Sequence, residues 1–67
     1  MNITVRGKKQ IADLRLRILT VLERSSLTEK ERKTLTNFLD CVEQVIKING
    51  KSLRFWGEPL CNLLFDA

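Results

Sequence analysis

Two helical patterns separated by a short break constrain the fold of this chain more than any other feature. Residues 9–24 and 29–48 each place apolar side chains at helical spacing, and Ser25-Ser26-Leu27 interrupts the pattern between them. Because the break leaves room only for a short turn, the two helices are expected to lie antiparallel. The sequence therefore predicts a mainly α fold, an antiparallel helical hairpin within one small domain spanning residues 1–67.

The segment 29–48 carries the clearest pattern. Thr28 and Glu31 have the spacing of a capping box, in which their side chains satisfy exposed backbone N–H groups at a helix start. The pair Asn49-Gly50 is expected to end the helix, since glycine tolerates the left-handed conformation there. Between these signals runs one apolar stripe, made of Leu35, Phe38, Leu39, Val42, Val45 and Ile46.

The segment 9–24 has two apolar stripes, whereas an ordinary surface helix has one. The first stripe covers an arc of about 100° and consists of Ile11, Leu14, Ile18, Val21 and Leu22. The second lies beyond Arg15 and consists of Ala12, Leu16 and Leu19. We therefore expect this helix to be covered by other parts of the protein from two directions.

Residues 2–6 alternate polar and apolar side chains before Gly7. The pattern predicts a short N-terminal strand with Ile3 and Val5 on one face and polar side chains on the other. A frayed N-terminus is the alternative for so short a segment.

Residues 53–65 form an apolar tail, in which only Arg54 and Glu58 are charged. Pro59 suits the first turn of a short C-terminal helix, because it needs no backbone N–H there. The tail either folds back over the second stripe of the first helix or forms an interface, within a dimer or with another protein. In the second case the interface residues are Phe55, Trp56, Leu60, Leu63, Leu64 and Phe65.

The composition argues against catalysis and against a metal or cofactor. The chain has no histidine and no tyrosine, so the usual proton-transfer groups near neutral pH are reduced to carboxylates, lysines and two cysteines. Cys41 and Cys61 lie too far apart in sequence for a common metal-ligand spacing. We expect no enzyme activity, no catalytic residues, no metal ligands and no cofactor.

No apolar signal segment follows Met1, and the apolar run 16–22 is short and interrupted by Arg17. We therefore expect a cytoplasmic protein with no membrane partner, in which Cys41 and Cys61 are reduced and mostly buried, with a disulfide as the alternative. A single core in so short a chain seldom supplies more than about 3–5 kcal/mol. A second copy, in a homodimer, is the expected source of further stability.

The net charge of +4 belongs to the N-terminal third of the chain. Residues 1–24 carry six basic and two acidic residues, whereas 25–50 and 51–67 are each balanced. This asymmetry favours nucleic acid or another acidic partner. The alternative is a solvated basic face that only keeps the protein in solution.

The order of strand 3–6, a helix, the turn 26–28 and a second amphipathic helix resembles the ribbon-helix-helix family of small dimeric transcriptional repressors. In that family two chains pair their N-terminal strands into an antiparallel ribbon that enters the DNA major groove. The resemblance covers residues 2–46. The resemblance implies that three side chains of the strand face the DNA bases, namely Asn2, Thr4 and Arg6. It also implies that Thr28 lies beside a DNA phosphate.

Two functional hypotheses of different classes follow. The first is a homodimeric DNA-binding transcriptional regulator, bacterial or phage, whose phosphate contacts come from Arg6, Lys8, Lys9, Arg17 and Arg24. The second is a protein-binding adaptor or inhibitor that docks on a larger regulatory protein through its apolar tail. Small helical-hairpin regulators, including the Spo0E-like phosphatases, are similar in layout to residues 11–15 and 38–40.

Overall fold

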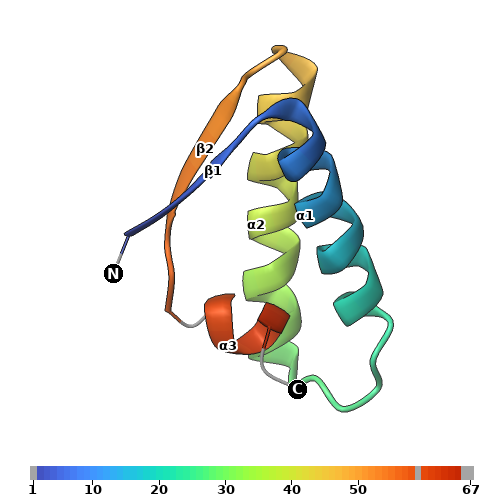
Figure 1. Cartoon of the computed structure of the whole chain (residues 1–67). Helices are drawn as coiled ribbons and strands as arrows, with labels where there is room; N and C mark the ends of the chain where they lie inside the picture. Colours follow the sequence, from blue (N-terminus) through green and yellow to red (C-terminus); the bar gives the residue numbers. More distant parts are fainter. Residues whose placement is uncertain (1, 59, 66–67) are drawn as a thin grey trace.

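An antiparallel hairpin of two helices, α1 (Lys8–Leu22) and α2 (Glu29–Lys47), is the frame of the structure (Figure 1). This computed structural model describes residues 2–58 and 60–65. The hairpin is preceded by one strand and followed by a second strand and a short helix: β1 (Asn2–Arg6), β2 (Ser52–Trp56) and α3 (Leu60–Phe65). The prediction of a mainly α hairpin with an N-terminal strand and a short C-terminal helix is confirmed, while Pro59 lies outside the described residues.

Side chains of α2 fix both the start of that helix and the turn before it. The capping box is present, since Thr28 N donates to Glu31 Oε1 at 2.9 Å and Glu31 N donates to Thr28 Oγ1 at 3.1 Å. Arg32 donates to the carbonyls of Leu22 and Arg24, at 2.9 and 3.2 Å. These bonds satisfy carbonyl groups at the end of α1, which stops two residues before the predicted position.

The end of α2 differs from the prediction in one respect. Asn49, and not Gly50, adopts the left-handed conformation, with φ of 64°. Gly50 N donates to Val45 O at 2.8 Å and Asn49 N donates to Ile46 O at 3.0 Å, the two bonds of a Schellman motif. Gly50 is required for space, because a Cβ atom there would lie 2.7 Å from Cγ1 of Val45.

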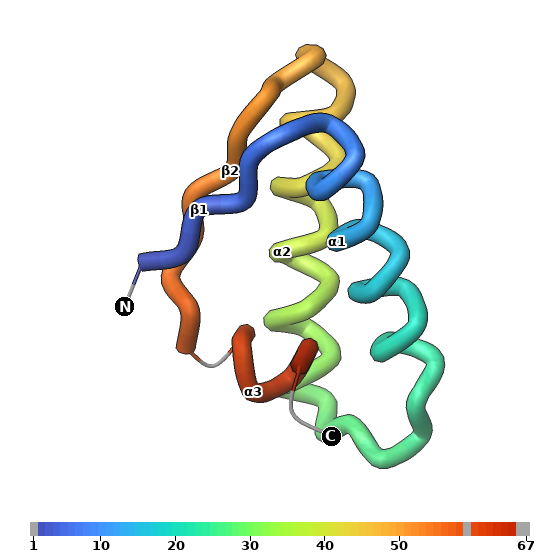
Figure 2. Tube along the Cα trace, viewed as in Figure 1, coloured from blue at the N-terminus to red at the C-terminus, as the bar shows by residue number. Residues whose placement is uncertain are grey.

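The two strands pair into an antiparallel ribbon that brings the start of the chain beside the segment that follows α2 (Figure 2). Asn2 lies opposite Trp56, and Arg6 lies opposite Ser52. Gly7 ends β1 with φ of 93°, a conformation that side-chain-bearing residues rarely adopt, and α1 begins at the next residue. The apolar tail therefore begins with a strand. The sequence predicted only a short helix within residues 53–65 and missed this strand.

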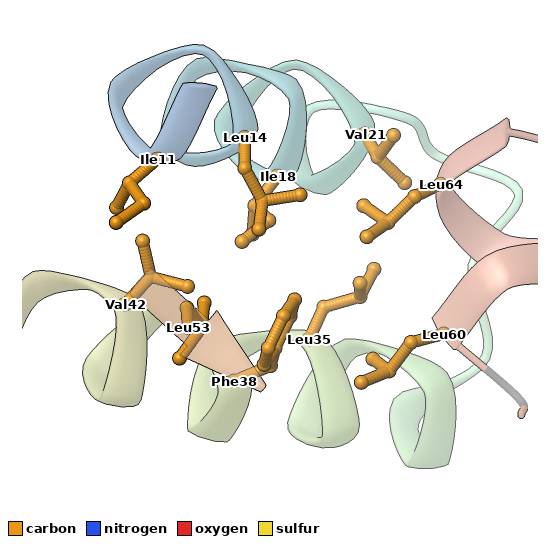
Figure 3. Close-up of a cluster of buried hydrophobic side chains, with 10 residues drawn as sticks. All are labelled: Ile11, Leu14, Ile18, Val21, Leu35, Phe38, Val42, Leu53, Leu60 and Leu64. Atoms are coloured by element: carbon orange, nitrogen blue, oxygen red, sulfur yellow. The ribbon is translucent and has the colours of Figure 1, made fainter. Parts of the chain in front are cut away.

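The ribbon and α3 cover the same face of the hairpin, and the core lies between these layers (Figure 3). Among the described residues its buried side chains come from both long helices, β2 and α3: Ile11, Leu14, Ile18, Val21, Leu35, Phe38, Val42, Leu53, Leu60 and Leu64. From α1 the core takes residues of the first apolar stripe only. The tail folds back onto its own chain, but over this first stripe and not over the second one.

The described residues leave two members of the second stripe of α1 exposed, contrary to the expected cover from two directions, while the third, Leu19, is half-buried. Ala12 is exposed and Leu16 is 56% exposed. The expectation that both thiols are mostly buried is also wrong for Cys41, which is exposed on α2, while Cys61 is half-buried. No helix in the described part of the chain is long and apolar enough to cross a membrane.

Candidate nucleic-acid interface

The outer face of the β1–β2 ribbon is polar and basic. Exposure alternates along both strands, so Ile3, Val5, Leu53 and Phe55 face the hairpin while their neighbours face solvent. Side chains directly opposite each other in an antiparallel pair share a face. The register therefore places six side chains together on the outer face: Asn2, Thr4, Arg6, Ser52, Arg54 and Trp56.

Arg54 lies in the middle of this face and Arg6 lies at one end of it. Arg6 lies opposite Ser52, and Arg54 lies opposite Thr4, so the two arginines are diagonal neighbours on adjacent strands. Such neighbours lie about 7–8 Å apart, which is close enough for both guanidinium groups to reach one ligand. Neither strand contains an acidic residue, and no described residue forms an ion pair with Arg6 or Arg54.

Trp56 lies at the other end of the outer face, opposite Asn2, with 58% of its surface exposed. An exposed indole beside arginine side chains offers a stacking surface as well as positive charge. The face therefore combines hydrogen-bond donors, positive charge and one aromatic ring.

One edge of β1 has unpaired backbone groups. Gly7 N donates to Lys51 O at 2.7 Å, which fixes the alternation of the antiparallel ladder. Ile3 and Val5 consequently bond to β2, whereas the N–H and C=O groups of Asn2, Thr4 and Arg6 point away from it. Within residues 2–58 and 60–65 these outward groups have no hydrogen-bond partner.

The predicted DNA-contacting residues fall into two groups in space. Asn2, Thr4 and Arg6 lie on the outer face, and Lys8 and Lys9 follow directly in the first turn of α1, where both are exposed. The second group lies away from the ribbon. Arg24 and Thr28 belong to the turn between the helices, at the opposite end of α1 from Gly7 (Figure 1).

Arg17, another predicted phosphate contact, is attached to the C-terminal helix. Its Nε donates to the carbonyl of Leu64 at 2.6 Å, and its guanidinium carbon lies 6.0 Å from the ring centre of Phe65. This arginine therefore holds α3 against α1, and a phosphate contact would compete with these bonds.

The structure does not bring the predicted protein-interface residues together on one surface. Leu60 and Leu64 are buried in the core, and Leu63 is half-buried against it. Phe55 also faces inward, with its ring centre 4.7 Å from that of Phe38. Exposed positions of this set are Trp56, on the ribbon, and Phe65, on α3.

Two basic residues of the interface were missed from the sequence. Lys51 and Arg54 lie in residues 51–67, where basic and acidic residues balance. The net charge of that segment therefore gave no sign of a basic surface. Folding places Arg54 diagonally across from Arg6, and it bonds Lys51 to Gly7, the residue before Lys8. The available signal was the alternation of polar and apolar residues from Ser52 to Phe55, directly after the turn signal Asn49-Gly50.

Among the residues that the structure describes, no three His, Cys, Asp or Glu side chains lie close enough to hold a metal ion. Comparisons with protein-family models, curated proteins and solved structures found no match to this chain. The functional argument therefore depends on the outer face and its geometry.

Proposed function

We propose that this protein binds duplex DNA through the outer face of the β1–β2 ribbon and acts as a homodimeric transcriptional regulator. The observation that carries the proposal is the concentration of positive charge there. Residues 2–9 and 50–57 contain five basic residues and no acidic one: Arg6, Lys8, Lys9, Lys51 and Arg54.

Each class of side chain on this face suits a different contact. Arginine binds the O6 and N7 atoms of guanine with two hydrogen bonds, so Arg6 and Arg54 are proposed to read bases or hold a phosphate. Asn2 and Thr4 add groups that both donate and accept hydrogen bonds. Lys8 and Lys51 flank the ribbon where it meets α1 and are proposed to contact the phosphate backbone.

The free edge of β1 supports a homodimer. If a second copy pairs there with Thr4 opposite the partner's Thr4, the outward backbone groups of residues 2, 4 and 6 all find partners. In this register Ile3 lies opposite the partner's Val5, which extends the apolar layer over the core. Arg6 lies opposite the partner's Asn2, so no like charges face each other. The strand is therefore complementary to itself.

A titration of the protein with duplex DNA at two salt concentrations tests the proposal. Affinity should fall steeply as salt rises, because each neutralised phosphate releases counterions. Arg54→Gln and Arg6→Gln should each weaken binding about tenfold, the effect of losing one charge-assisted contact.

Lys33→Gln is the matched control, since it removes the same charge from an exposed position on α2. It should leave the affinity within about twofold. The proposal is wrong if no complex forms at low salt, or if Lys33→Gln weakens binding as much as Arg54→Gln does.

The alternative function, docking on a protein through the apolar tail, has less support. Leu60 and Leu64 are needed for the core and are not available to a partner without unfolding α3. Of the tail residues, Trp56 belongs to the ribbon face and serves the first proposal equally well.

A further inference from the structure

The face of the hairpin that the ribbon and α3 leave uncovered is apolar in its middle and basic at its margins. We infer that this face is a docking groove for an acidic amphipathic helix of a partner protein. The groove is formed by Ala12 and Leu16 of the second stripe of α1 and by the neighbouring side of α2, and Lys8 is the one lining residue that it shares with the proposed DNA contacts.

Two adjoining hollows form the groove. The larger, of about 480 Å³, is lined by Ala12, Arg15, Leu16, Glu43, Ile46 and Lys47. The smaller shares Ala12 and Ile46 with it and extends to Lys8, Asn49 and Gly50, at the end of α2. Together they follow the line where the two helices meet.

A helix is the element that fits such a groove. Leu16 is 56% exposed and Ile46 is 41% exposed, and they project from antiparallel helices toward the same hollow. A third helix lying along this line can pack against α1 and α2 at the usual separation of about 8–10 Å. It would present apolar residues at i, i+3, i+4 and i+7, as in other helix-in-groove complexes.

The charges around the groove select an acidic helix. Lys8, Arg15 and Lys47 line it, and Glu43 is the acidic residue among the lining side chains. Glu43 is already paired with Arg15, since Arg15 Nε lies 3.2 Å from Glu43 Oε2. The two lysines remain without an ion-pair partner in the described part of the chain.

The same charges argue against a second copy on this face. Two copies meeting here would bring together grooves that each carry an excess of positive charge, and such repulsion disfavours the pairing. The proposed self-contact is the edge of β1, on the layer that covers the opposite face of the hairpin. Lys8 lies between the two surfaces, so Lys47 is the lysine of the groove that the proposed DNA contacts do not use.

A peptide selection tests the inference directly. The library consists of 18-residue helical peptides with leucine fixed at positions i, i+3, i+4 and i+7, and with Glu, Gln or Lys at random elsewhere. Peptides selected on the folded protein should be enriched in Glu over Lys, because only they complement Lys8 and Lys47.

Substitutions then locate the bound peptide. Leu16→Ser and Ile46→Ser should each weaken its binding at least about tenfold, because each removes an apolar contact. Ile48→Ser is the matched control, since Ile48 is 76% exposed in the turn directly after α2 but does not line the groove. It should leave peptide affinity unchanged, and all three variants should bind DNA as the parent protein does.

The inference is overturned by any of three results: no peptide is selected, the selected peptides are basic or neutral, or Leu16→Ser and Ile46→Ser leave their affinity unchanged. A dimer that Leu16→Ser dissociates, measured by sedimentation, would show that a second copy covers the face and would also overturn it. Loss of DNA binding alone would count against the proposed function and not against the groove.

Discussion

At the scale of single residues, the turn after α2 depends on Asn49 and Gly50, each for a different physical reason. Asn49 supplies the left-handed conformation, which a short polar side chain tolerates better than most. Gly50 supplies space, because a Cβ atom would also lie 3.1 Å from the carbonyl oxygen of Val45. This turn reverses the direction of the chain, so that β2 runs back along the hairpin. The position of Arg54 on the outer face therefore depends on the turn.

Gly50→Ala should therefore lower the free energy of unfolding by about 1–3 kcal/mol, the usual cost of forcing extra atoms into a packed site. Asn49→Gly is the control, because glycine adopts the left-handed conformation freely and should change stability by less than about 1 kcal/mol. Equilibrium unfolding in urea measures both. An unchanged midpoint for Gly50→Ala would mean that Val45 moves away at no cost.

At the scale of elements, α3 joins the core through one side and leaves the other in solvent. Leu64 is completely buried, whereas its neighbour Phe65 is 57% exposed. Helix α3 contacts both α1 and α2, so it closes the end of the hairpin core that the ribbon does not reach.

Leu64→Ala should lower the free energy of unfolding by about 2–5 kcal/mol, because it leaves a cavity in the core. Phe65→Ala also truncates a large apolar side chain of α3, but at an exposed position where the contact with Arg17 is lost, and its cost should stay below about 1 kcal/mol. Urea unfolding followed by circular dichroism compares the two variants. Equal costs would contradict the placement of α3.

The elements also show how far the sequence could predict this fold. The hairpin was predictable because its signals are local: the capping box at Thr28, the stripe on residues 29–48 and the break after residue 24. Strand β2 was not predicted, since its partner lies at the far end of the chain and its apolar residues resembled the rest of the tail. For the same reason the interface was predicted only in its β1 half, without Arg54.

At the scale of the whole molecule, the two-stranded ribbon is the part that a second copy can extend. Its β1 edge exposes the N–H of Thr4, whereas the N–H of Val5 is used in the ladder with β2. Proline removes a backbone N–H, so its effect depends on which edge the replaced residue faces.

Thr4→Pro should convert the proposed homodimer into a monomer without unfolding the chain, because it removes only an outward N–H. Val5→Pro should instead disrupt the ribbon itself and lower stability. Size-exclusion chromatography with light scattering at several concentrations measures the mass, and circular dichroism checks the fold. A monomeric parent protein, or a Thr4→Pro variant that still dimerises, would refute pairing through β1.

The pairing of β1 with β2 also determines when the ribbon can form during protein synthesis. During synthesis β1 leaves the ribosome before β2, so it cannot form the ribbon until residues 52–56 have followed. The helices, whose contacts are closer in sequence, can associate before that, because nearby segments meet sooner than distant ones. A translation product that stops at Gly50 would contain both long helices but only half of the basic face. Under the proposed function, such a product would lack Lys51 and Arg54 and would therefore bind DNA less tightly than a chain that contains both strands.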